Sequence, residues 1–385
     1  MYSKNKLIDC LNLNPIDIEI CDVTLRDGEQ TPGVAFSMNE KIDIAIELDS
    51  IGVEIIEAGF PVVSAEEKQI VKKIANIGLD ANICCLSRSI NTDVDAAIDC
   101  EVDIVSIFVA LSDLHLKYKY HKKKEEMLDC AMDTIDYAKE HGLKVRFAIE
   151  DASRTKLEDI KHAFLLAEER RVEYVSIADT IGILNPSTTH YLISEIKKIV
   201  KTPICIHCHD DLGMATANTL AAAEAGAKQL HTTINGIGER AGNAALEEVI
   251  IALCIQYGLN RYDATSLTNL SHMVKEYSKI NTSVNKSIVG KNVFSHESGI
   301  HVMAVLENHR TYELFDPELV GGKRNLIIGK HTGTRALKGI IESRGISITE
   351  TELLKLIDKI KNYGDIKEGL SNTVIDGMIS NILES

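Results

Sequence analysis

The chain has 385 residues, of which 45% are apolar and 26% charged, so it can bury a large core and suits a large barrel with a modest C-terminal extension. Its formal net charge of −15 argues against a nucleic-acid partner, because no excess of lysine and arginine is available to neutralise phosphates. The first residues, MYSKNKLIDCLNLN, lack the apolar run of a secretion signal, and no segment approaches the ~20 apolar residues that span a bilayer. The nine cysteines are odd in number and core-like in position. We therefore expect reduced thiols, no membrane partner and a cytoplasmic location.

Short β-branched runs alternate with amphipathic helical stretches through the first two thirds of the chain. Strands are predicted at 18–24, 53–59, 81–86, 103–109, 143–149, 173–178, 204–208 and 229–234. Helices are predicted between and after them, at 39–50, 65–76, 92–100, 123–140, 156–170, 187–200, 214–224 and 243–256. Ser64 is expected to cap the second helix. Eight strand-then-helix units imply parallel strands that close into an α/β (β/α)₈ TIM barrel of about 250 residues. A doubly wound open sheet is the alternative, but no glycine-rich fingerprint follows the first strand.

The alternation stops after about residue 258. A helix at 267–279 is followed by a loop rich in glycine and histidine, and then by helices at 334–343 and 350–363, the last with Thr349 as its expected cap. We expect a catalytic barrel over 1–260 and a C-terminal helical and lid region over 261–385, without a feedback regulatory domain. Long loops of this kind are often functional lids.

One local basic run stands out in the acidic chain. Residues 121–124 read His-Lys-Lys-Lys and are followed at once by two glutamates. The run could supply a pocket for a small phosphate-bearing ligand. A solvated helix start is the favoured interpretation, because charge runs usually form solvated surfaces.

Three segments dense in ionisable and amide groups follow predicted strands. They are DVTLRDGEQ at 22–30, HCHDD at 207–211 and NGIGERAGN at 235–243. The active site of a TIM barrel lies at the C-terminal ends of its strands, so these segments are expected to meet at one mouth.

His207 and His209 are two residues apart, so on a strand both imidazoles point to the same face. Two imidazoles and one carboxylate can hold a divalent cation with open positions for substrate. Asp27 can supply the carboxylate, because the first, seventh and eighth strands are neighbours in the ring. Asn243 can supply an amide oxygen directly or through water. The alternative is that the histidines are hydrogen-bonded core residues without a metal.

Other polar residues are expected at the same mouth. Arg26 suits a substrate carboxylate, because a guanidinium binds it with two parallel hydrogen bonds, although pairing with a nearby glutamate is the alternative. Glu57 and Glu150 lie at strand ends, where acidic groups can orient the histidines. We take Arg26 and Glu150 as candidate catalytic residues, and Thr180 offers a hydroxyl at the mouth.

These motifs together resemble the 2-oxo-acid acetyl-CoA condensing synthases, the family of isopropylmalate, homocitrate and citramalate synthases. The likeness continues through NKSIVGKNVFSHESGIH at 285–301 and IGKHTG at 328–333, so it covers nearly the whole chain. The resemblance implies a divalent metal (Mg²⁺, Mn²⁺ or Zn²⁺) and acetyl-CoA as co-substrate. It implies that Asp27, His207 and His209 bind the metal, with Asn243 close by.

The resemblance also implies that Arg26 and Thr180 hold the 2-oxo acid, and Gln30 is expected to bind substrate with them. It implies that His301 and Tyr312 transfer protons from a lid that enters from the partner subunit of a homodimer. An imidazole suits this role because it exchanges protons near neutral pH. Met303 departs from the many relatives that have an aspartate two residues after the lid histidine, so the proton relay is expected to lack that acid, as in lysine-pathway homocitrate synthases.

The choice of acceptor rests on three short segments. Residues 111–113, 150–154 and 178–180 look closer to homocitrate synthases of the nitrogen-fixation and methanogen types. We therefore expect a homocitrate synthase that condenses acetyl-CoA with 2-oxoglutarate. The alternatives are a 2-isopropylmalate synthase, which takes 2-oxoisovalerate, and a citramalate synthase, which takes pyruvate. A 3-hydroxy-3-methylglutaryl-CoA lyase fits less well, because no catalytic cysteine loop is found beside residues 238–243. The third alternative is a protein that binds a metal without catalysing a reaction.

Overall fold

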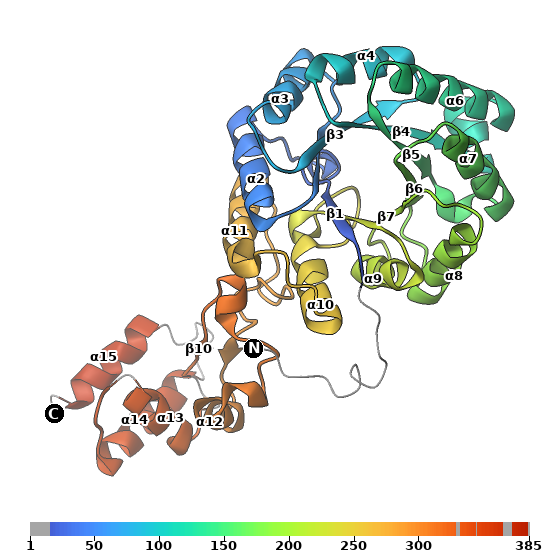
Figure 1. Ribbon diagram of the computed structural model, residues 1–385. Coiled ribbons are helices and arrows are strands. Elements are labelled where there is room, and N and C mark those ends of the chain that lie inside the picture. The colour runs from blue at the N-terminus through green and yellow to red at the C-terminus, as the bar shows by residue number, and fades with distance from the viewer. Residues whose placement is uncertain (1–15, 329–331, 344, 365–371, 384–385) are drawn as a thin grey trace. The chain divides into compact units, whose positions relative to one another are not determined.

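The computed structural model describes residues 16–328, 332–343, 345–364 and 372–383. The chain divides into two compact units between Thr282 and Ser283. The first unit contains eight strands surrounded by helices, and the second is mainly helical (Figure 1). No helix in the described ranges is long and apolar enough to cross a membrane.

The eight strands of the first unit form a closed, all-parallel barrel in sequence order, in which β1 pairs with both β2 and β8. This confirms the predicted (β/α)₈ architecture. The strands are β1 (Glu19–Asp22), β2 (Ile55–Gly59), β3 (Asn82–Arg88), β4 (Ile104–Ala110), β5 (Lys144–Glu150), β6 (Tyr174–Asp179), β7 (Ile204–Cys208) and β8 (Gln229–Thr232).

Helices cover the outside of the ring (Figure 1). Ser64 accepts a hydrogen bond from the backbone N–H of Glu67, and so caps α3 as predicted. Gly52 ends α2 in the left-handed conformation, which glycine adopts without steric cost. The longer helices are α2 (Met38–Ile51), α3 (Ala65–Ala75), α4 (Asn91–Cys100), α6 (Lys124–Glu140), α7 (Leu157–Glu169), α8 (Pro186–Lys197), α9 (Ala215–Ala225), α10 (Leu246–Tyr257) and α11 (Leu267–Ser278).

Alternation along each strand separates the core from the site. On β5, Phe147 and Ile149 are fully buried, and the Phe147 ring meets Phe164 of α7 edge to face, with centroids 6.2 Å apart. Arg146, Ala148 and Glu150 take the other positions and line a pocket inside the ring. On β5 the large apolar residues therefore pack toward the helices, while the charged residues face the barrel interior.

The barrel unit extends past the expected boundary at residue 260, because α11 packs on the barrel. Tyr277 of α11 donates to Asp43 of α2 at 3.0 Å, and Asn235 donates to the Ser271 carbonyl at 2.9 Å.

The second unit has a core of its own, built mainly from the aliphatic faces of its helices. The predicted helices appear as α13 (Thr334–Ser343) and α14 (Glu350–Gly364), and Thr349 caps α14 together with Glu352. The expected loop region also contains α12 (Gly299–Glu307) and a two-stranded parallel sheet of β9 (Ser295–His296) and β10 (Asn325–Leu326). A fourth helix, α15 (Asn372–Leu383), follows. Three residues of the IGKHTG motif, 329–331, lie outside the described residues.

Candidate metal and substrate site

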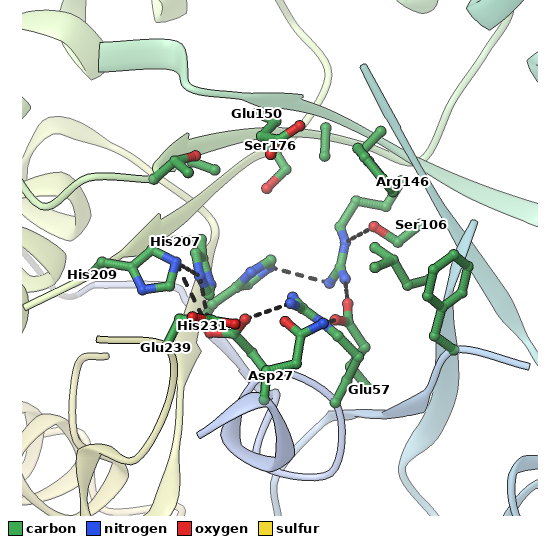
Figure 2. A pocket seen from close by; sticks show the side chains of 18 of the residues that line it. Asp27, Glu57, Ser106, Arg146, Glu150, Ser176, His207, His209, His231 and Glu239 are labelled. Carbon is green, nitrogen blue, oxygen red and sulfur yellow. Dashed lines mark hydrogen bonds and ion pairs between the residues drawn. The ribbon is translucent and has the colours of Figure 1, made fainter. Parts of the chain in front are cut away.

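A pocket of about 390 Å³ opens inside the ring at the C-terminal ends of the strands (Figure 2). Its walls come from β2 to β8 and from the loops after β1 and β8. The charged and imidazole groups that line it are Arg26, Asp27, Glu57, Lys119, Arg146, Glu150, His207, His209, His231, Glu239 and Arg240.

Asp27, His207 and His209 bring one ligand atom each to within 4.8 Å of one another, as the sequence predicted. The two Nε2 atoms are 3.3 Å apart, and Asp27 Oδ2 is 3.6 Å from His207 Nε2 and 4.0 Å from His209 Nε2. Ligand atoms about 2.1 Å from one ion lie roughly 3.0–3.5 Å apart, so a small contraction would bring all three atoms into reach of one ion and leave positions open for substrate. Figure 2 shows the three side chains converging on one point.

The protonation states of the cluster suit a cation. Burial lowers the pKa of His207 to about 3 and also lowers that of His209. Burial alone would raise the pKa of Asp27, but the Arg26 guanidinium together with His207, His209 and the Asn243 amide outweighs it, and the pKa is held at about 2. Two neutral imidazoles and an ionised carboxylate are the forms that bind a metal.

Asn243 lies beside the cluster. Its Nδ2 donates to Asp27 Oδ2 at 2.7 Å and to the Ile237 carbonyl at 3.1 Å, while its buried Oδ1 has no hydrogen-bond partner. Buried polar atoms are rarely left unpaired, so this oxygen is available to a cation or to a water bound to one. The donor set and this orphaned atom fit a divalent metal.

Arg26 contacts two carboxylates. Its Nη1 donates to Asp27 Oδ1 at 2.7 Å, and its Nε donates to Glu57. Its side chain remains 14% exposed and lines the pocket. The pairing with a glutamate that the sequence left open is therefore present, together with access to the pocket.

Arg146 is the main pocket residue that sequence reasoning missed. Its guanidinium lies in the pocket wall, ion-paired with buried Glu57 and bonded to Ser106 Oγ, Gln229 Oε1 and His231 Nε2 at 3.1 Å each. Arg26, Arg146 and Glu57 together carry one net positive charge. The available signal was an arginine at an inward position of an alternating strand, where a buried cation needs a special reason.

The remaining predicted residues lie around the same pocket. Glu150 binds Lys119 Nζ at 2.6 Å, and Thr180 Oγ1 accepts from the Asp151 N–H at 2.8 Å. Gln30 also lines the pocket. The suggestion that Glu57 and Glu150 orient the histidines is wrong, because each carboxylate is engaged by cationic side chains instead.

His301 and Tyr312 lie together in the second unit. Their rings stack with centroids 3.8 Å apart and an interplanar angle of 24°. Both side chains are exposed. Met303 instead packs against the helical core of that unit, where a carboxylate would be buried among aliphatic groups. That this pair enters the mouth from a partner subunit stays a prediction.

Comparison with known proteins matches both units. The family model described as HMGL-like matches residues 17–274, and the model described as homocitrate synthase post-HMGL domain-like matches residues 288–368. The chain therefore belongs to the HMGL-like family, in the branch that carries this second domain.

Individual relatives share most of the chain. Homocitrate synthase AksA of Methanosarcina acetivorans is 66% identical over 383 residues, 99% of this chain and 95% of the relative. The 2-isopropylmalate synthase of Methanocaldococcus jannaschii is 46% identical, over 98% of this chain and 74% of its own length. The HMG-CoA lyase structure from Bacillus subtilis has a TM-score of 0.64 at 20% identity, covering 70% of this chain and 96% of the lyase, and shows likeness of fold alone.

Proposed function

We propose that the protein is a homocitrate synthase. It condenses acetyl-CoA with 2-oxoglutarate and hydrolyses the thioester to release homocitrate and CoA. The observation that carries the proposal is the Asp27, His207 and His209 cluster with the Arg26 guanidinium beside it. The near full-length likeness to homocitrate synthases supports the choice of reaction.

Each part of the reaction has a candidate group in the chain. Asp27, His207 and His209 would hold the divalent cation, with the Asn243 amide beside it. Bound there, the cation would supply a Lewis acid for the keto oxygen of the acceptor. Arg26 would bind the acceptor carboxylate that lies next to the keto group. Thr180 and Gln30 lie at the same mouth. Glu150 offers a carboxylate that can relay a proton.

The lining of the pocket favours an acceptor with a second carboxylate. Arg146 places a cation in the wall, beside the hydroxyls of Ser106 and Ser176 and the imidazole of His231. A branched aliphatic acceptor such as 2-oxoisovalerate would need apolar contacts there and would bring no carboxylate to this polar wall.

The stacked His301 and Tyr312 would complete the site as proton-transfer groups. The imidazole would take a proton from the acetyl methyl group, and the new carbon nucleophile would attack the keto carbon. We propose that this pair enters from the partner subunit of a homodimer. The eight described cysteines are free thiols, which supports a reducing, cytoplasmic location.

The decisive experiment measures CoA thiol release from acetyl-CoA with 2-oxoglutarate, 2-oxoisovalerate, pyruvate or 2-oxoadipate as acceptor, with divalent metal present. We expect the highest kcat/KM with 2-oxoglutarate. Equal or better use of 2-oxoisovalerate would replace the assignment with an isopropylmalate synthase, and a preference for pyruvate would replace it with a citramalate synthase.

A further inference from the structure

We propose that the segment between β4 and α6 binds the nucleotide end of acetyl-CoA, with its phosphate groups on Lys117, Lys122 and Lys123. The inference rests on the proposed function, because it takes acetyl-CoA as the substrate. It adds a binding site that the metal cluster and the mouth pocket do not include.

The segment has an unusual backbone. After β4 the chain forms a short helical turn at Asp113–His115, a π-helical turn at Leu116–Tyr120 and a left-handed residue, His121, with φ 53°. The Lys122 N–H donates back to the Leu116 carbonyl at 3.3 Å. π-Helical turns are rare and often occur at functional sites.

This turn lines a second, open pocket of about 480 Å³ at the start of α6. Lysine side chains from both sides of the turn line it, together with one imidazole, one leucine and two acids: Asp113, Leu116, Lys117, His121, Lys122, Lys123 and Glu126. The basic run identified in the sequence is therefore part of a concave surface, as a small phosphate-bearing ligand requires.

The three lysine side chains of this pocket form no ion pairs within the described residues. Within the described residues, Lys117, Lys122 and Lys123 have no carboxylate at ion-pair distance, whereas the adjacent Lys119 and Lys124 are paired with Glu150 and Asp159. The Glu126 carboxylate accepts from the Lys123 backbone N–H at 2.9 Å and caps α6. Three ammonium groups without an ion-pair partner outnumber the two acids of the pocket, Asp113 and Glu126, so on a chain of net charge −15 they form a local basic site for a polyanion.

The same turn also reaches the mouth of the barrel. Lys119 lines the mouth pocket and holds Glu150 at 2.6 Å, while Lys117 and His121, each two residues away, line the second pocket. Acetyl-CoA is a long ligand, with the thioester at one end and three phosphate groups at the other. Its pantetheine arm can therefore run from the mouth across this turn, so that both ends are bound at once.

An exposed aromatic side chain accompanies the lysines. Tyr118 is 65% exposed, and Lys117 Nζ lies 4.8 Å from the centre of its ring. Leu114 on the preceding turn is also exposed. A solvent-facing ring beside ammonium groups offers a stacking surface for the adenine base.

The test uses the full-length protein loaded with metal and the triple variant K117A/K122A/K123A. We expect the KM for acetyl-CoA to rise about tenfold, the combined effect of three exposed charge pairs. The kcat, the KM for 2-oxoglutarate and the turnover of S-acetylpantetheine, which lacks the nucleotide, should stay at wild-type values. Calorimetry should show a matching loss of affinity for adenosine 3′,5′-bisphosphate.

The matched control is K73A/K198A/K201A, which removes the same charge from exposed lysines near the opposite end of the barrel and should leave the KM unchanged. If the wild type releases thiol but the triple variant keeps its KM and its nucleotide affinity, the proposal is overturned and the proposed function stands. If the wild type releases no thiol, the proposed function fails, and calorimetry alone decides. Loss of adenosine 3′,5′-bisphosphate binding in the variant would then support the site, and undiminished binding would overturn it.

Discussion

Asp27, His207 and His209 show how the fold sets the ionisation of single residues. Each is at most 6% exposed, yet the carboxylate stays ionised because the Arg26 guanidinium and the Asn243 amide contact it, and the imidazoles stay neutral because they are buried. Burial and neighbouring charge thus lower the pKa values of all three groups, which leaves the carboxylate charged and the imidazoles neutral, and shifted pKa values are frequent at functional sites.

Replacing one histidine should remove the metal without unfolding the barrel. For His207→Ala we expect loss of bound metal and a fall in kcat/KM of more than about a hundredfold, beyond what loss of an indirect partner causes. Metal content, far-UV circular dichroism and turnover measure the three effects. His190→Ala, on the exposed surface of α8, is the control. A chelator-treated His207→Ala protein with full activity would contradict the assignment.

Asp22 should make stability depend on pH. Burial raises its pKa to about 7, although Thr24 donates to it at 2.9 Å. The folded protein therefore binds more protons than the unfolded chain between pH ~4 and ~7, so this contribution to stability is lost as pH rises through that window. The expected loss is of the order of a few kcal/mol.

Asp22→Asn removes this titration and keeps the shape of the side chain. We expect the variant to gain stability relative to the wild type when the pH is raised from 5 to 8, measured as the difference between urea unfolding curves. Other titrating groups contribute equally to both proteins. A difference that does not change with pH would show that Asp22 does not titrate as described.

At the scale of elements, the alternation of strand and helix made the barrel predictable. All eight strand-and-helix pairs appear close to their expected residues, and two predicted caps, Ser64 and Thr349, form. The meeting of Asp27, His207 and His209 was predictable because a His-x-His strand and an acidic turn carry local signals.

Other features depend on tertiary contacts that no local pattern records. In the sequence, Arg146 is only one of the alternate residues of its strand. Its burial in the pocket wall follows from the closure of the strands into a barrel. The position of α11 is set by packing on α2, so residue 260 could not be recognised as lying inside the barrel unit. The short strands β9 and β10 have two residues each, too few for periodicity.

The inner face of β5 should control the choice of acceptor. Arg146→Leu removes the cation in the pocket wall while Glu57 keeps Arg26 as a partner. We expect the KM for 2-oxoglutarate to rise by about 30- to 100-fold, as for a lost charged hydrogen bond. The relative use of 2-oxoisovalerate should increase. Phe147→Leu, the next residue on the opposite face, should change stability and leave acceptor preference intact. An unchanged preference in Arg146→Leu would place the second carboxylate elsewhere.

At the scale of the whole molecule, the proposed reaction draws on residues from both units. Asp27, His207 and His209 belong to the barrel unit, and His301 and Tyr312 belong to the C-terminal unit. If the lid is exchanged between subunits, activity requires the dimer.

Mixed dimers test this exchange. A His207→Ala subunit and a His301→Ala subunit, each inactive alone, should form a heterodimer with one site in which both residues are intact. We expect up to about half of the wild-type turnover for that heterodimer, because a two-fold interface repeats every contact. Differently tagged subunits, co-expressed and purified through both tags, provide the measurement. Inactive heterodimers would mean that the lid acts within its own chain or that His301 is dispensable.

The seam between β1 and β8 joins segments that lie about 210 residues apart, as in the pairing of Asp22 with Thr232. A cation held between Asp27, just after β1, and the histidines at the end of β7 would tie the chain across this seam. It would stabilise the closed barrel against opening at this seam, since a ligand that binds only the closed form stabilises that form by mass action. Local opening of β1 should then become rarer when metal is added. Amide hydrogen exchange should slow in β1 and β8 and change little in β4 and β5, on the far side of the ring.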